Sequence, residues 1–120
     1  MPTLSGEYLN FETYRGNGTA VRTPMWFAES GSSIYVYTLA KTPKVKRVRN
    51  NPQVRIAPCD MRGNLQGDWI NAKAQIVDND EAKRGHALLR EKYGWKKAIG
   101  DIYSRLVGRE RTVIRIDPGM

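Results

Sequence analysis

The sequence predicts one α+β domain, mainly β, with five or six antiparallel strands and short helices arranged as a sheet or small barrel. Three observations predict it. Segments with alternating apolar and polar residues recur along the chain, turn-forming residues separate them, and a few stretches have helical spacing. The chain has 120 residues, a length typical of one domain, and neither a repeat nor a linker divides it. We therefore expect a single domain over residues 1–120.

The first three strands are expected near the N-terminus. The aromatic-rich segment 8–14 precedes Asn17-Gly18, a strong hairpin signal because both residues tolerate a positive φ. Residues 19–29 have the pattern of a strand interrupted by Pro24, which has no N–H to donate and so marks an edge or a bulge. Residues 34–39 alternate clearly and predict the third strand.

Helices and strands alternate in the remainder of the chain. Thr42-Pro43 is typical of a helix start, with threonine as the N-cap and proline in the first turn. Asp78 followed by Glu81 resembles a capping box, and Gly94 is a plausible stop for the helix that it opens. The other expected elements are a helix end near Asn50, strands over 53–58, 68–77 and 111–116, and a further helical piece over 95–107.

The net charge indicates an anionic partner. Twenty Lys and Arg against twelve Asp and Glu give +8 at pH 7 and an isoelectric point near 9.9. Such a balance favours nucleic acid, a phosphorylated cofactor or an acidic membrane surface, although a solvated basic face is an equal alternative. Six of the cations fall within fifteen positions: Lys41, Lys44, Lys46, Arg47, Arg49 and Arg55.

Several classes of protein are disfavoured by what the sequence lacks. No run of 18 apolar residues and no secretory leader pattern is present, so we expect a cytoplasmic protein without a membrane partner. The single cysteine, Cys59, and the single histidine, His86, cannot build a disulfide framework or the usual protein-ligated zinc centre. No GxGxxG motif, P-loop or pair of catalytic carboxylates is found.

Two lysines break a local rule where the helix at Thr42-Pro43 begins. Lys41 and Lys44 place positive charge at a helix N-terminus, where the macrodipole favours negative charge. Free N–H groups and two ammonium groups suit a phosphate, and Thr38 and Thr42 offer hydroxyls beside it. The alternative is a solvated lysine pair.

The second strand offers further candidates for ligand binding. Arg22 either points toward a ligand lying along the sheet or is an ordinary outward-facing arginine. The run from Pro24 to Phe27 either flanks a flat heterocycle or packs in the core. Tyr35, Tyr37 and Trp69 are expected in a core or subunit interface, and His86 as a surface or core residue.

Taken in order, these segments resemble the pyridoxamine 5′-phosphate oxidase-like split-barrel family, and most of all its small members that use the deazaflavin coenzyme F420. The resemblance covers nearly the whole chain, and its ordered set of motifs is more specific than any single one. The matching segments are Tyr8–Thr13, Gly18-Thr19, Thr23–Phe27, Ile34–Thr38, Lys44–Pro52, Val54–Asp60, Arg62-Gly63, Ala72–Ala74 and Lys92–Trp95.

The resemblance implies a six-stranded antiparallel split β-barrel with short helices that forms a homodimer, with two cofactor sites at the subunit interface. Lys44 would bind the cofactor phosphate, with Thr38, Lys41 and Thr42 beside it. Five consecutive residues would lie along the tricyclic ring: Arg22, Thr23, Pro24, Met25 and Trp26. Asn51 and Pro52 would shape the pocket, and a partner subunit would add Trp69 or residues after Tyr93.

The activity implied is an F420-dependent oxidoreductase that transfers a hydride between the deazaflavin and a small conjugated organic substrate. This agrees with the scarcity of catalytic side chains, since such a coenzyme supplies the hydride and the protein supplies orientation. Lys46, Arg47 and Arg55 either serve the acidic tail of F420 or are solvated. The first alternative is an FMN-binding flavoprotein of the same family, and the second a basic nucleic-acid-binding barrel. A haem-binding split barrel is disfavoured because His86 is the only histidine.

Overall fold

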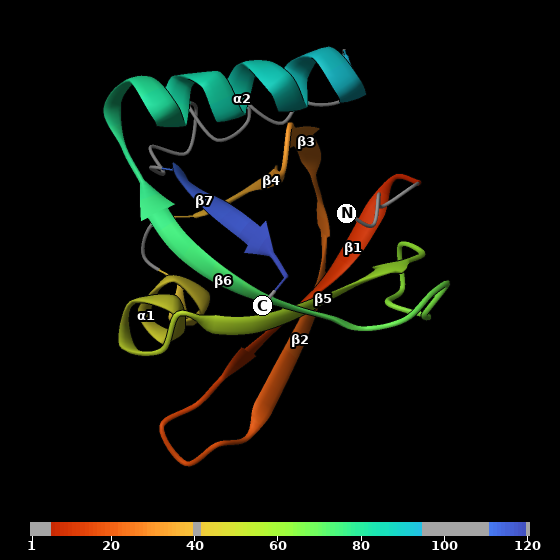
Figure 1. Cartoon of the computed structure of the whole chain (residues 1–120), viewed down its shortest axis with the longest axis vertical. Helices are drawn as coiled ribbons and strands as arrows, with labels where there is room; N and C mark the ends of the chain where they lie inside the picture. Colours follow the sequence, from red (N-terminus) through yellow and green to blue (C-terminus); the bar gives the residue numbers. More distant parts are fainter. Residues whose placement is uncertain (1–5, 40–41, 95–110, 120) are drawn as a thin grey trace.

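The computed structural model describes residues 6–39, 42–94 and 111–119 (Figure 1). Seven strands and two helices occupy these residues: β1 (Tyr8–Tyr14), β2 (Ala20–Trp26), β3 (Ala28–Ser30), β4 (Ser33–Leu39), α1 (Pro43–Asn50), β5 (Gln53–Cys59), β6 (Ile70–Val77), α2 (Asn79–Tyr93) and β7 (Arg111–Pro118). None of the helices in this part of the chain is long and apolar enough to cross a membrane. The helical piece expected over 95–107 lies outside the described residues.

The strands form one antiparallel sheet with the order β2-β1-β5-β6-β7-β4-β3. The two strands at the ends of this order, β2 and β3, are neighbours in the chain and are separated only by Phe27. The chain therefore runs from one end of the sheet directly to the other, and β2 contacts β4 without pairing with it (Figure 1). This arrangement is a strongly curled sheet, which agrees with the predicted class.

The expected number of strands, six, is wrong because the run 19–29 forms two strands. The break lies at the buried Phe27, where the chain leaves β1 and begins to pair with β4. Pro24 does not interrupt its strand: it lies within β2, opposite Asn10, at the end of the sheet order. Proline is tolerated there because an edge strand leaves one row of backbone groups unpaired.

The expected capping box at the start of α2 is also wrong. Asp78 is the N-cap residue, but its side chain makes no capping hydrogen bond. The Glu81 carboxylate instead accepts hydrogen bonds from the Tyr35 hydroxyl at 2.8 Å and from the Arg115 guanidinium at 2.8 Å. These partners on β4 and β7 tie α2 to the sheet and lower the pKa of the Glu81 carboxyl.

The hydrophobic core fills the inner face of the curled sheet. Alternate residues of each strand point inward, so Leu9, Phe11 and Ile56 are fully buried together with Ile114 and Ile116. The helix α1 contributes Val45 and Val48 to the buried set, and it packs against β1 and β6. The helix α2 lies across β3, β4 and β7 (Figure 1).

Gly85 allows α2 to approach the sheet closely. A Cβ atom at this position would lie 2.8 Å from Val113 Cγ1 and 3.2 Å from Tyr35 Cδ1. Both neighbours are buried, and valine is stiff about χ1, so neither can move away cheaply. The close approach therefore depends on the missing side chain.

We expect Gly85→Ala to destabilise the fold by about 1–2 kcal/mol, since the overpacking outweighs the better helix propensity of alanine. Urea unfolding followed by circular dichroism measures the change. In the double variant with Val113→Ala, which removes the clashing methyl groups, the cost should be smaller than the sum of the two single changes. If the free-energy costs of the two single changes simply add up in the double variant, the alanine at position 85 does not clash with Val113.

Candidate functional site

A cleft of about 240 Å³ opens beside the first turn of α1, between β2 and β4. Its lining contains six of the residues that the sequence predicted for cofactor binding, Thr23, Pro24, Met25, Trp26, Thr38 and Lys44, together with Tyr37. The structure thus gathers three separate segments at one place. Tyr37, which the sequence assigned to a core or interface, is partly buried and also lines the cleft.

The connection from β4 to α1 brings Lys44 back over the end of its own strand. Lys44 Nζ donates a hydrogen bond to Thr38 Oγ1 at 3.4 Å. Burial, and next the positive charge of Arg47, lowers the pKa of the Lys44 ammonium. No carboxylate lies within ion-pair distance of Lys44 among the described residues. A half-buried cation without a counter-ion is the feature of this cleft that best suits a phosphate.

Of the other two residues predicted near the phosphate, Thr42 does not line the cleft. Thr42 precedes α1 in an extended conformation, as an N-cap whose side chain makes no capping hydrogen bond. Lys41 lies outside the described residues. Their contact with a cofactor stays a prediction.

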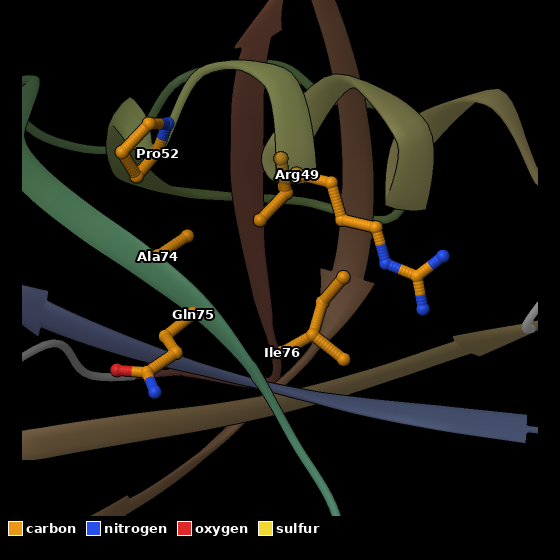
Figure 2. A pocket seen from close by; sticks show the side chains of 6 residues that line it. Arg49, Pro52, Ala74, Gln75 and Ile76 are labelled. Carbon is orange, nitrogen blue, oxygen red and sulfur yellow. The ribbon is translucent and has the colours of Figure 1, made fainter.

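Asn51 and Pro52 lie at the opposite end of α1. The Asn51 side chain accepts a hydrogen bond from the Gln53 N–H at 3.1 Å and so shapes the start of β5. Pro52 lines a different, wider groove of about 440 Å³ between α1 and β6. In this groove the Arg49 guanidinium extends away from Pro52 and Gln75 (Figure 2). The structure therefore separates this pair from the cleft at Lys44.

An aromatic stack supports the apolar side of the cleft. The rings of Trp26 and Tyr93 are 4.7 Å apart and inclined by only 14°. The buried Tyr93 hydroxyl accepts a hydrogen bond from the Phe27 N–H at 2.9 Å and lies 2.6 Å from the Glu7 carbonyl oxygen. Burial raises the pKa of Tyr93, so its hydroxyl stays protonated and able to donate. Tyr93 thus holds Trp26 and the break between β2 and β3 in place.

The sequence reading missed the most completely buried charge of the described chain, Glu12. Its carboxylate is fully buried, although glutamate rarely is. It accepts hydrogen bonds from Arg22 Nε at 2.7 Å, from Arg55 Nε at 2.6 Å and from the Tyr14 hydroxyl at 2.6 Å. Burial alone would raise the pKa of Glu12, but hydrogen bonds from Arg55, Tyr14 and Arg22 lower it to about 2.

Arg22 is therefore engaged with Glu12 and is not part of the cleft lining. The Arg22 guanidinium carbon lies 5.1 Å from the centre of the Trp69 ring, and that of Arg55 lies 4.8 Å from it. Arg55, considered for an acidic tail, is likewise paired with Glu12. The Asn17-Gly18 signal did not indicate the first pair: a two-residue loop would place Thr23 opposite Glu12, whereas the connection over residues 15–19 places Arg22 there.

The remaining candidates for chemistry are the metal-ligating side chains, Cys59 and His86. No group of three or more His, Cys, Asp or Glu side chains within the described ranges has the arrangement of a metal site. Burial raises the pKa of the Cys59 thiol, so this cysteine is not an activated nucleophile. The His86 ring packs at 5.8 Å from that of Tyr37, in a tilted contact.

The comparison with known protein families agrees with the family resemblance of the sequence. A family model described as pyridoxamine 5′-phosphate oxidase matches residues 10–119. No curated protein matches the sequence.

Many solved structures resemble the fold, and three of them show how low the sequence identity is. A conserved hypothetical protein from Mycobacterium tuberculosis has 23% identity and a TM-score of 0.72, over 97% of this chain and 75% of that one. A haem storage protein, HutZ, from Vibrio cholerae has 17% identity and a TM-score of 0.71, over 95% and 82%. An F420-H2-dependent reductase has 16% identity and a TM-score of 0.65, over 97% and 98%. At these identities the likeness shows the fold alone.

Proposed function

Because the chain belongs to the pyridoxamine 5′-phosphate oxidase family, we propose that it is an oxidoreductase that uses the deazaflavin F420. The substrate class is a small conjugated organic molecule that exchanges a hydride with the coenzyme. The observation that carries this proposal is Lys44, a half-buried cation without a carboxylate partner among the described residues, at one end of a cleft with an apolar wall.

The cleft residues fit a phosphorylated tricyclic coenzyme in three respects. Lys44 and Thr38 would hold the phosphate through an ammonium group and a hydroxyl. Pro24, Met25 and Trp26 would lie against the ring system. Among the described strands, β2 pairs with β1 alone, so its other row of backbone groups is available to the polar edge of the ring.

The coenzyme supplies the hydride when bound, so the chain needs no acid, base or nucleophile of its own. The roles left to its residues are binding and orientation. Trp26 is fixed by its stack on Tyr93, and this rigidity holds one wall of the cleft in a single position. Orientation of this kind contributes much of the rate in hydride transfer, because the reacting atoms must be held in line.

A second copy of the chain would complete the site. Small-molecule pockets usually enclose about 300–1,000 Å³, whereas this cleft has about 240 Å³. One chain therefore covers only part of a coenzyme of this size. The homodimer expected from the resemblance would supply the missing wall.

The cellular setting that we propose is the cytoplasm. The unpaired, buried Cys59 agrees with a reducing compartment of this kind.

Binding of the two candidate coenzymes tests the proposal directly. The purified protein is titrated with F420 and separately with FMN, and fluorescence anisotropy is followed at low and moderate salt. Tight F420 binding with weak FMN binding is the expected result. A preference for FMN would move the chemistry to that of a flavoprotein. Binding of neither coenzyme, with salt-dependent binding of oligonucleotides, would replace the proposal with the nucleic-acid-binding alternative.

We expect Lys44→Ala to weaken binding of either phosphorylated coenzyme about ten- to a hundredfold, the usual effect of losing a charge-assisted hydrogen bond. Arg49→Ala is the matched control, since this exposed cation lies on the same helix but does not line the cleft. Both affinities come from the anisotropy titration. Equal losses in the two variants would mean that only the general positive charge matters.

The pH dependence of binding gives a second test of Lys44. The charged ammonium binds phosphate, and its pKa is lowered by burial and by Arg47. Affinity should therefore fall with rising pH, and should do so at a lower pH than for an ordinary lysine, whose pKa is about 10.4. In Lys44→Arg the guanidinium stays charged and this decline should disappear. A decline that persists in the arginine variant would contradict the assignment.

A further inference from the structure

The buried Glu12 carboxylate has no remaining capacity for a ligand. Tyr14 Oη and Arg55 Nε donate to one oxygen, and Arg22 Nε and Arg55 Nη2 donate to the other, the last at 3.1 Å. Four donors around a fully buried carboxylate satisfy it completely. Glu12 therefore acts as an anchor that fixes two guanidinium groups side by side on the outer face of the sheet.

The two arginines, in contrast, retain donors that Glu12 does not use. Among the described residues only Nε of Arg22 has an acceptor, so both of its terminal nitrogens remain available. One terminal nitrogen of Arg55 forms no hydrogen bond with Glu12. The two side chains are 53% and 34% exposed, so the arginine pair is partly open to solvent.

The Glu12 cluster, which consists of Glu12, Arg22 and Arg55, has more positive than negative charge. One carboxylate faces two guanidinium groups, and the described chain provides no further carboxylate in ion-pair contact with either arginine. One positive charge is therefore left over on a pair of groups whose geometry is fixed. A rigid pair of guanidinium groups is well suited to bind a carboxylate or phosphate, because little side-chain entropy is lost on binding.

Trp69 adds an aromatic surface to the same place. Both guanidinium groups lie about 5 Å from the centre of its ring. Arg22 and Pro24 also lie on the same face of β2, two residues or about 6.6 Å apart, so the cluster neighbours the cleft at Lys44 without lining it.

We propose that Arg22 and Arg55, held by Glu12, form a second anion site that binds the carboxylate or phosphate group of a small planar ligand beside Trp69. The site is distinct from the one at Lys44 and does not require that the chain catalyse a redox reaction. Its occupant is either an acidic group of the substrate or an acidic group of the coenzyme beyond its first phosphate.

A pair of probes that differ only in charge tests the site on the unmodified chain without coenzyme. Benzoate and benzamide have the same ring, but only benzoate has a full negative charge. Each is titrated while the indole N–H resonance of Trp69 is followed by NMR, the resonance being assigned through Trp69→Phe. We expect saturable shifts with benzoate, at an affinity at least about tenfold above that of benzamide. Equal responses to both probes would overturn the proposal.

The role of the arginine pair is tested by Arg22→Gln. This variant removes the free guanidinium donors of Arg22 but keeps the two hydrogen bonds from Arg55 to Glu12, so the anchor remains. Arg49→Gln is the control, because Arg49 is also an exposed arginine and has no ion-pair partner in the described part of the chain. Benzoate affinity should fall about tenfold in the first variant and stay unchanged in the second. Equal effects would show that only the net charge attracts the anion.

Saturation with F420, which has an acidic tail beyond its phosphate, then identifies the source of the anion. If benzoate still binds to the coenzyme-loaded chain, the site belongs to the substrate. If the coenzyme displaces benzoate, the site binds a second acidic group of the coenzyme. Both results support an anion site, whereas failure of the coenzyme to bind would affect the proposed function and leave the benzoate result standing.

Discussion

Replacing Glu12 by glutamine is expected to destabilise the folded chain by about 3–5 kcal/mol, the usual cost of breaking a buried ion pair from one side. Glutamine has nearly the shape of glutamate, but it leaves Arg22 and Arg55 without their counter-charge. It also places an amide nitrogen, a donor, among donors from Arg55, Arg22 and Tyr14. Urea unfolding at pH 7 measures the loss.

The matched control for Glu12→Gln is Glu91→Gln. Glu91 lies on the exposed face of α2, and no ion pair of the described residues includes it. This second change should alter the free energy of unfolding by less than about 0.5 kcal/mol. Similar losses in the two variants would contradict the role given to the Glu12 cluster.

The free energy of unfolding at acid pH should also depend on Glu12. Its pKa is lowered from 4.5 to about 2 in the folded chain. A lowered pKa contributes stability that is present above the unfolded value and is lost as the pH falls toward the folded value. The original chain should therefore lose about 3 kcal/mol more than Glu12→Gln between about pH 5 and pH 2. If both proteins lose the same free energy of unfolding over this pH range, the acid sensitivity comes from groups other than Glu12.

Tyr93→Ala is expected to cost about 3–5 kcal/mol, since it removes a buried ring and leaves the Phe27 N–H without its acceptor. It also removes the partner on which Trp26 is stacked. Coenzyme affinity should therefore fall as well, although Tyr93 does not line the cleft. Thermal unfolding and the anisotropy titration give the two readouts.

Tyr93→Phe separates the hydroxyl from the ring. This variant keeps the stack on Trp26 and loses only the hydrogen bonds to Phe27 and Glu7, so its stability should fall by about 1–3 kcal/mol. Its coenzyme affinity should remain close to that of the original chain. A loss of affinity equal to that of Tyr93→Ala would mean that the stack does not position Trp26.

The local parts of the fold were predictable from the sequence because local chemistry determines them. Asn17-Gly18 specified the hairpin between β1 and β2, and Thr42-Pro43 specified the start of α1. Three segments of the cleft at Lys44 were found in the same way, since each has its own pattern along the chain. The break at Phe27 was not predictable, because it depends on β2 and β3 pairing with different strands.

The Glu12 cluster could not be predicted from local sequence patterns. The hairpin register brings Arg22 opposite Glu12, but a two-residue Asn-Gly loop would have paired Glu12 with Thr23, so this contact could not be derived from the turn signal. Arg55 and Trp69 arrive through the pairing of β1 with β5 and through the connection that follows β5, neither of which has a local signal. A glutamate between aromatic residues gave no sign that it would be fully buried, because its burial depends on partners 10 and 43 residues away.

The position of β7 in the sheet has a consequence for how the protein is made. This strand lies between β6 and β4, and it pairs Ile34 with Ile116. While the chain emerges from the ribosome, β4 thus lacks one of its two neighbouring strands until β7 has been synthesised. The edge of β4 that pairs with β7 stays open for that time, and an unpaired strand edge makes an unfinished chain prone to aggregation and a substrate for chaperones. Two separately expressed fragments, divided before β7, should accordingly regain structure only when they are mixed.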